Sequence, residues 1–178
     1  MPQAADSNEP VCQWCLKDLD EKPSFAFLLF KNTSLCLECS EKLIRKRKTV
    51  RFGRVKAEVL YESSEGFHKM WDQYAGRKDA ALASVFLQPW PDLIRKLKRK
   101  TVHADSLETA RILRAWNIAA KKADFRKGDI WIGSSPESLK KLPHPEKYKK
   151  IILLHAPLKS RGTIRVQAEK IFDKIRQF

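Results

Sequence analysis

The sequence has no long apolar run, no internal repeat and no low-complexity tract. Its apolar segment FAFLLF at 25–30 is far shorter than the roughly 18 residues that a membrane-spanning helix requires. The N-terminal stretch MPQAADSNEPV has no basic segment followed by an apolar one, so we expect no export signal. These absences exclude a solenoid of repeats and predict a cytoplasmic protein without a membrane span.

Acidic residues are scarce after the first forty positions. The chain has 36 Lys and Arg against 21 Asp and Glu, a formal net charge of +15. Residues 1–40 carry a net charge of −3, so residues 41–178 carry +18. The segment at 42–56 has eight basic residues and no acidic one, and basic runs follow at 95–100, 121–127 and 147–150. Such a surplus favours a polyanionic partner, most often nucleic acid, although a soluble protein with solvated lysines has the same composition.

The chain does contain enough apolar material for a folded α/β domain. Hydrophobic residues make up 43% of it, with five Trp and nine Phe. Strand and helix patterns alternate, which favours an α/β domain with a mostly parallel sheet flanked by helices. We expect strands at 25–30, 50–63, 129–133 and 151–155, a short helix after Cys39 (SEKLIRK), and helices at 65–74, 79–87, 92–100, 106–125, 134–142 and 163–178.

Local signals set several of these boundaries. Ser40 and Asp92 are good N-cap residues for the helices that follow them. Asp105 and Glu108 form a capping-box pattern, and Pro136 suits the first turn of a helix. Gly53, inside the strand pattern at 50–63, predicts a turn or a bulge.

All four cysteines occur in two C-x-x-C pairs, Cys12/Cys15 and Cys36/Cys39. Four thiolates complete the tetrahedral shell of a structural zinc ion and leave no open position for catalysis. The alternatives are disulfides, an iron–sulfur cluster and thiols that bind no metal. A reducing cytoplasm disfavours disulfides. The sequence therefore predicts a flexible tail at 1–9, a zinc-ribbon-like module with four cysteines at 10–45 and an α/β domain at 46–178.

The order of these segments resembles the ComF family of late competence proteins. The resemblance is carried by the paired cysteines, by EVLYESSEGFHKMWDQYAGRKDAALASVFL at 58–87 and by IILLHAPLKSRGTI at 151–164. It implies a phosphoribosyltransferase-like fold for 46–178 and a role in DNA uptake during natural transformation.

The chain departs from that family in its late loop. Where the family has an acidic pair that faces the ribose hydroxyls of phosphoribosyl pyrophosphate, this chain has His155 and Ala156. Another segment that is typical of the family is matched only weakly, by WIGSSPESLKK at 131–141. A loop that leads into a helix N-terminus still suits phosphate. The resemblance therefore implies a degenerate donor site, with no catalytic residue, in which phosphate contacts fall to Lys159, Ser160, Arg161, Gly162 and Thr163.

These observations favour a nonenzymatic competence protein that contacts single-stranded DNA, or a competence helicase, through a basic surface. One alternative is an active phosphoribosyltransferase that uses magnesium and phosphoribosyl pyrophosphate; another is a structural zinc-ribbon adaptor. The residues expected to contact nucleic acid are Arg45, Lys46, Arg47, Lys48, Arg51, Arg54, Arg95, Lys96, Lys98, Arg99 and Lys100.

Aromatic side chains offer a second means of binding single strands, because bases stack on them. Trp71, Tyr74, Trp90 and Trp116 are the candidates. Helical spacing favours core packing for Trp71 and Trp116. Trp90 lies between two prolines, so we expect it to be the exposed aromatic residue.

Overall fold

The computed structural model describes residues 11–17, 19, 34–122, 128–142 and 144–157. The predicted tail at 1–9, the strand at 25–30 and the helix at 163–178 lie outside these ranges. Within them, six strands form one sheet in the order β1-β2-β6-β5-β3-β4. Strand β1 is antiparallel to β2 and every other neighbouring pair is parallel, which confirms the predicted α/β class with a mostly parallel sheet.

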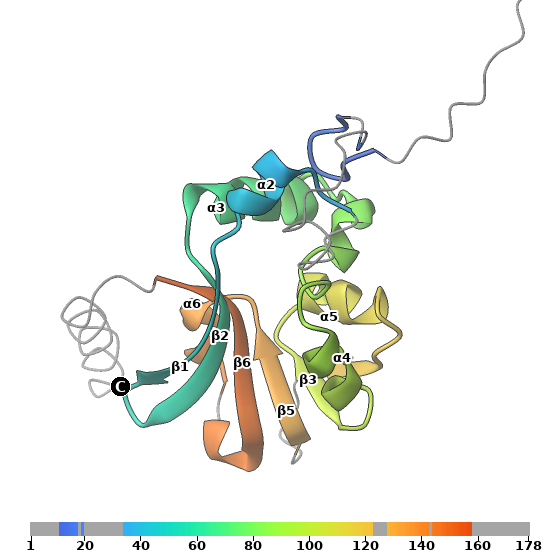
Figure 1. Ribbon diagram of the computed structural model, residues 1–178. Coiled ribbons are helices and arrows are strands. Elements are labelled where there is room, and N and C mark those ends of the chain that lie inside the picture. Colours follow the sequence, from blue (N-terminus) through green and yellow to red (C-terminus); the bar gives the residue numbers. More distant parts are fainter. Residues whose placement is uncertain (1–10, 18, 20–33, 123–127, 143, 158–178) are drawn as a thin grey trace, which may run out of the picture.

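The strands and helices alternate along the chain (Figure 1). The strands are β1 (Arg45–Phe52), β2 (Val55–Glu62), β3 (Val102–Ala104), β4 (Ala120–Lys122), β5 (Gly128–Gly133) and β6 (Tyr148–Ala156). The α-helices are α2 (Leu37–Glu41), α3 (Glu65–Trp71), α4 (Pro91–Leu97), α5 (Leu107–Arg114) and α6 (Pro136–Leu139). A π-helical turn (Asp72–Gly76) continues α3, and short 3-10 helices cover Ala80–Ser84 and Pro145–Lys147.

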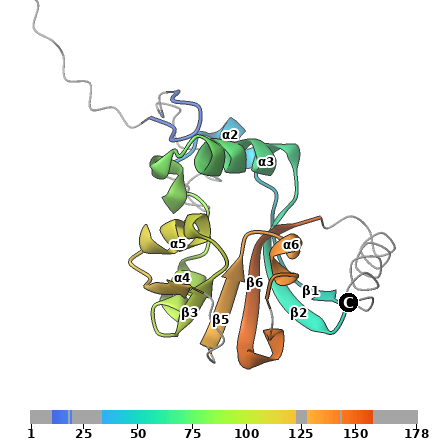
Figure 2. The same cartoon turned by 180° about the vertical axis from the view of Figure 1, so that it is seen from behind.

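The sheet has an apolar core on each face. The larger core joins sheet residues such as Leu60, Ile132 and Ile152 to α3, α4 and α5. The smaller core lies on the face seen in Figure 2, where α6 packs, and includes Val59 and Trp131. The described part of the chain therefore has three layers, with α4 and α5 on one side of the sheet and α6 on the other, while α3 lies across the ends of the strands (Figures 1 and 2).

The strand pattern at 50–63 is a hairpin, in agreement with the turn expected at Gly53. Phe52 pairs with Val55, so Gly53 and Arg54 form a two-residue turn. Gly53 has a φ of 59°, which a residue without a side chain adopts at little cost. The hairpin turn fixes the register of β1 on β2. This register determines which basic side chains lie on the same face of the sheet.

The helix predicted after Cys39 is wrong in its position. Helix α2 has Cys36, rather than Ser40, as its N-cap residue, and the chain is already in β1 at Arg45. Residues Lys48 to Phe52 each pair with a residue of β2. Lys and Arg favour helix weakly, and the ladder of hydrogen bonds to β2 overrides that preference.

The predicted caps of α4 and α5 are also wrong by one or two residues. Helix α4 begins at Pro91 with Trp90 as the N-cap residue, because proline needs no hydrogen bond for its nitrogen in the first turn. Helix α5 is capped by Ser106, whose Oγ accepts a hydrogen bond from the Thr109 N–H. Asp92 and Asp105 instead accept hydrogen bonds from distant parts of the chain.

Helix α5 ends eleven residues before the predicted position of 125, and the helix predicted at 79–87 is the shorter 3-10 helix. Asn117 has a φ of 55°. Its N–H donates to the Arg114 carbonyl at 2.9 Å, and the Ile118 N–H donates to the Leu113 carbonyl at 3.0 Å. This is the Schellman arrangement that ends helices. The chain then enters β4 beside β3.

Candidate metal centre and candidate nucleic-acid interface

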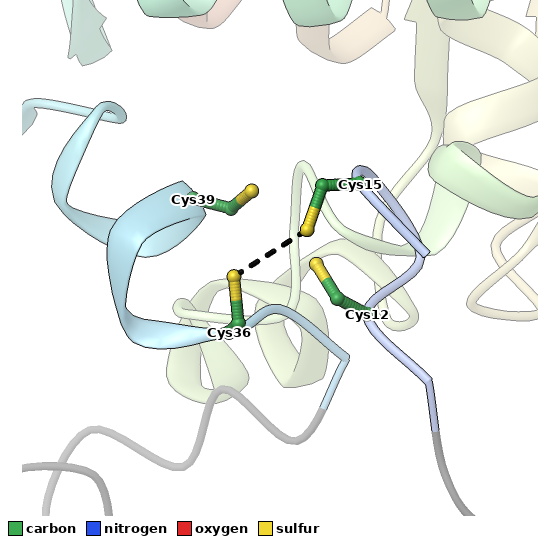
Figure 3. Close-up of side chains that lie close together, drawn as sticks. All are labelled: Cys12, Cys15, Cys36 and Cys39. Atoms are coloured by element: carbon green, nitrogen blue, oxygen red, sulfur yellow. Dashed lines mark hydrogen bonds between the residues drawn. The ribbon is translucent and has the colours of Figure 1, made fainter. Parts of the chain in front are cut away.

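The two cysteine pairs meet at one point (Figure 3). Cys12 and Cys15 lie on a turn, and Cys36 and Cys39 lie at the start and in the body of α2. The four sulfur atoms all lie within 4.8 Å of one another, and the Cys15 and Cys36 sulfurs are 3.6 Å apart. All four thiols are free, and this separation is far longer than the roughly 2 Å of a disulfide bond. The cluster can hold a metal ion.

The spacing of the sulfurs fits a tetrahedral metal site. Four thiolates at about 2.3 Å from a zinc ion lie roughly 3.8 Å from one another. The Cys12, Cys36 and Cys39 side chains are buried, and Cys15 is exposed. A metal ion bound by all four sulfurs would have no position left for a reacting water molecule, which is typical of a structural site.

Burial and hydrogen bonding act in opposite directions on these thiols. Burial raises the pKa of Cys36 and Cys39. At Cys12 burial also acts to raise the pKa, but the backbone N–H groups of Cys15, Cys36 and Trp14 outweigh it and lower the pKa to about 7. A divalent cation would favour the thiolate form of every ligand, since metal binding replaces the thiol protons.

Backbone hydrogen bonds shape the turn of the first cysteine pair and join it to the segment before the second pair. The Cys12 N–H donates to the Lys17 carbonyl at 2.8 Å, and the Gln13 N–H donates to the Ser34 carbonyl at 2.8 Å. Leu16 has a φ of 62°, the left-handed conformation that reverses the chain after the first pair. Cys12, Cys36 and Cys39 belong to the larger core, so the candidate metal centre is continuous with the α/β domain.

Helix α3 packs close against the end of α2. A side chain at Gly66 would place its Cβ 2.4 Å from the Lys42 carbonyl oxygen, so only glycine fits there. Ser64 reaches the same carbonyl, to which its Oγ donates at 3.1 Å. These contacts join the candidate metal centre to the carboxyl end of β2.

A second feature is a charged area on the sheet face that carries α4. Glu58 and Lys150 lie two residues before the core residues Leu60 and Ile152 on their strands, and residues two apart share a face. Toward the amino ends of β2 and β6, this face therefore changes from apolar to charged. No helix among the described residues covers this part of β2 and β6 in Figure 1. We call it the basic face and define it by Arg47, Arg51, Lys56, Glu58 and Lys150.

Strand register brings these residues together. Arg51 pairs with Lys56 across the β1–β2 hairpin, and Glu58 lies beside them on β2. Glu58 forms ion pairs with both Arg47 and Lys150. Burial acts to raise the pKa of Glu58, but hydrogen bonds from Lys150 and Arg47 outweigh it and lower the pKa. The face thus carries four cations, of which Arg47 and Lys150 pair with Glu58, and Arg51 is exposed at the edge of the face.

Arg47 links the basic face to α4. Its guanidinium donates to an Asp92 carboxylate oxygen at 2.7 Å and lies 5.9 Å from the ring centroid of Trp90. Basic residues follow along α4 and the turn after it, namely Arg95, Lys96, Lys98, Arg99 and Lys100. The two basic segments predicted from the sequence are therefore connected through the start of α4.

The other basic residues predicted at 45–54 do not lie together. The Arg45 guanidinium donates to Ser40 Oγ at 2.6 Å, and Lys46 forms an ion pair with Glu62. Lys48 pairs with Val59, which belongs to the core on the opposite face of the sheet. Arg54 is exposed in the hairpin turn.

Lys56 and Lys150 are two members of the basic face that are not among the residues expected from the sequence to contact nucleic acid. Both lie in basic runs, at 42–56 and 147–150, but only the register of three strands shows that they share a face with Arg47 and Arg51. Alternation of charged and apolar residues along β2 is the one local signal that separates Lys56 and Glu58 from the buried Ala57 and Val59.

The predicted exposure of Trp90 is wrong. Trp90 is half-buried and packs against the larger core, with its ring edge-on to Tyr61. Prolines on both sides of Trp90 set the backbone direction but do not indicate that the ring turns inward. Trp71 and Trp116 also pack against this core, which confirms the core role predicted for them, and Tyr74 is buried.

The late loop is described only as far as Pro157, so Lys159 to Thr163 lie outside the described residues. His155 is half-buried: its Nδ1 is 2.7 Å from Ser63 Oγ, and its ring centroid is 4.4 Å from that of Phe67. Burial, and then the nearby His68, lower the pKa of His155 to about 4. The imidazole is neutral at pH 7 and packs against the core.

Comparison of the chain with models of protein families, with curated proteins and with solved structures gave no match. Among the described residues, no helix is both long and apolar enough to cross a membrane.

Proposed function

We propose that this protein binds single-stranded nucleic acid through the basic face and α4, with a structural zinc ion at the four cysteines. The observation that carries the proposal is the cluster of Arg47, Arg51, Lys56 and Lys150 on a part of the sheet that no described helix covers. Lysine and arginine side chains bind nucleic acid through phosphate contacts, which give affinity without reading the sequence.

The arrangement of the cations favours a site that binds the phosphate backbone of a nucleic acid over one that recognises its bases. Strands lie about 4.8 Å apart, so cations on β1, β2 and β6 form a row across the sheet, and a flexible single strand can follow such a row. The described part of the row offers no exposed aromatic ring, since Trp90 is half-buried. Affinity should therefore come from charge and depend strongly on salt.

The resemblance to the ComF family supplies the cellular context of this proposal. It supports a phosphoribosyltransferase-like fold and a role in DNA uptake, with a competence helicase as the protein partner. His155 and Ala156 stand where that family has its acidic pair, and a neutral, packed imidazole cannot replace a carboxylate that binds ribose or metal. We therefore propose a binding role without transferase activity.

The test is the affinity for a fluorescently labelled, single-stranded oligonucleotide, measured by anisotropy at several salt concentrations. With about four phosphate contacts, log K should fall against log salt with a slope near −3. In the Arg51→Gln/Lys56→Gln variant the slope should be shallower by about 1 to 1.5. The control is Lys140→Gln/Lys141→Gln at the end of α6, which removes the same charge from the opposite face. An affinity that ignores salt, or an equal loss in both variants, would contradict the proposal.

A further inference from the structure

A cavity beside α5 is lined by cations and belongs to neither of the sites above. Its volume is about 500 Å³, within the range of pockets that hold small organic ligands. It lies between the segment 74–83 and the C-terminal half of α5. The lining residues are Tyr74, Lys78, Ala80, Ala83, Arg111, Arg114 and Ala115.

Three cationic residues line this cavity, and none of its lining residues is acidic. Arg111 and Arg114 are three residues apart on α5, so they project from the same side of the helix, and Lys78 lines the cavity from the other segment. No acidic side chain among the described residues forms an ion pair with any of the three. Like charges held together repel, and a bound anion would relieve that repulsion.

The rest of the wall is apolar and firmly held. Three alanines line it, and their small side chains leave the volume open. The Tyr74 ring packs against Trp71 and Phe86, and its hydroxyl donates to the Glu108 carbonyl at 2.6 Å. The cavity therefore combines apolar lining residues, one of them a packed tyrosine ring, with three cationic ones.

The backbone at Lys78 is itself unusual. Lys78 has a φ of 59°, a conformation that costs a residue other than glycine of order 1 kcal/mol. Glycine would adopt this φ with less strain, and yet a lysine occupies the position. Lys78 thus lines the cavity from a strained backbone position.

We propose that this cavity binds a small phosphate ester of about mononucleotide size. Arg111, Arg114 and Lys78 contact the phosphate, and the Tyr74 ring and the alanines contact the remainder. Guanidinium groups match the geometry of phosphate oxygens with paired hydrogen bonds, which favours phosphate over a simple halide. The site does not depend on the basic face, since none of the residues of the basic face lines it.

The experiment is isothermal titration of the full chain with adenosine 5′-monophosphate, and with adenosine as the phosphate-free probe. We expect adenosine to bind at least about tenfold more weakly, because it lacks the charged group. Arg111→Gln/Arg114→Gln should weaken binding of the monophosphate by at least about tenfold, and Lys140→Gln/Lys141→Gln by less than about twofold. Ala115→Trp, at the exposed end of α5, should abolish binding by filling the cavity without removing charge.

Equal binding of both probes, no binding at about 5 mM, or an equal loss in the two double variants would overturn the proposal. Thermal unfolding of each variant checks that it is folded. A further competition experiment compares a 5′-phosphorylated oligonucleotide with a 5′-hydroxyl one. If only the phosphorylated strand displaces the monophosphate, the result would support the site and identify the phosphorylated end of a strand as its ligand. Binding of the monophosphate without such displacement would support it with a free nucleotide as its ligand.

Discussion

The cysteine cluster and the basic face are built in opposite ways. The cluster brings together four thiols from one turn and from the start of α2, and it buries three of them. The basic face draws its cations from three strands, leaves Arg51 exposed and pairs two of the four cations with Glu58. A closed set of soft ligands suits a structural role, whereas an open row of cations suits a long, flexible anion.

The two regions also differ in charge. The N-terminal forty residues, which hold the cysteines, carry a net charge of −3, and the rest of the chain carries +18. The cysteine cluster therefore has little attraction for a polyanion, although it is continuous with the core that supports the sheet. We infer that the cysteines stabilise the protein, whereas the strands bind its partner.

Loss of the metal ligands should have the strongest consequence. Cys36→Ser should lower the zinc content from about one ion per chain to near zero, by elemental analysis. It should also lower the midpoint of thermal unfolding by at least about 10 °C, because the binding free energy of a structural zinc is part of the folding free energy. The control is Leu37→Ser, a substitution to the same residue at the exposed neighbour in α2. A variant that keeps its zinc, or a native chain with two disulfides and no metal, would refute the structural zinc.

A charge reversal on the hairpin should separate the two regions. Arg51→Glu/Lys56→Glu should lower the affinity for single-stranded DNA by about 10- to 100-fold, because it removes two phosphate contacts and adds repulsion. Its zinc content should not change, since both residues lie on the hairpin, away from the cysteines. Lys140→Glu/Lys141→Glu, on the opposite face, should reduce affinity several-fold less. If the charge reversal also releases zinc, the two regions are not independent.

The sequence predicts the cysteine cluster and only part of the basic face, and the reason is the range of the interactions. Each C-x-x-C pair is a local turn, so its ligands are readable from spacing alone. The basic face depends on register between β1, β2 and β6, which are separated by up to about a hundred residues. Without that register, Lys48 and Arg51 are equivalent in the sequence, and yet they lie on opposite faces.

The fold likewise has features that local sequence predicts and features that depend on long-range pairing. The α/β class follows from the alternation of strand and helix patterns, and the strands at 129–133 and 151–155 follow from short apolar runs; the structure confirms both. The sequence predicts a helix after Cys39 because Ser40 is a good N-cap residue, but pairing with β2 places the end of that segment in a strand. The strand at Ala120–Lys122 is hidden inside a helical pattern, and only Asn117 marks the end of that helix.

A weaker effect should come from the one carboxylate of the basic face. Glu58→Gln should raise the affinity for single-stranded DNA by about two- to fivefold, because Lys150 and Arg47 lose their ion pairs with Glu58, although Arg47 keeps its ion pair with Asp92. It should also destabilise the protein by about 1 kcal/mol at pH 7. The pKa of Glu58 is lowered in the folded state, so its contribution to stability is present above the unfolded value near 4.5 and is lost as the pH falls below it.

Chemical unfolding of wild type and Glu58→Gln at a series of pH values measures this contribution. The difference in unfolding free energy should be largest above about pH 5 and should shrink toward zero at about pH 3. Glu38→Gln is the matched control, because Glu38 pairs with Lys17 at the exposed surface of the cysteine cluster, where an ion pair contributes little. Its substitution should leave DNA affinity unchanged. If Glu58→Gln lowers DNA affinity instead, Glu58 positions Arg47 and Lys150 for phosphate, and the carboxylate is part of the binding surface rather than a competitor for it.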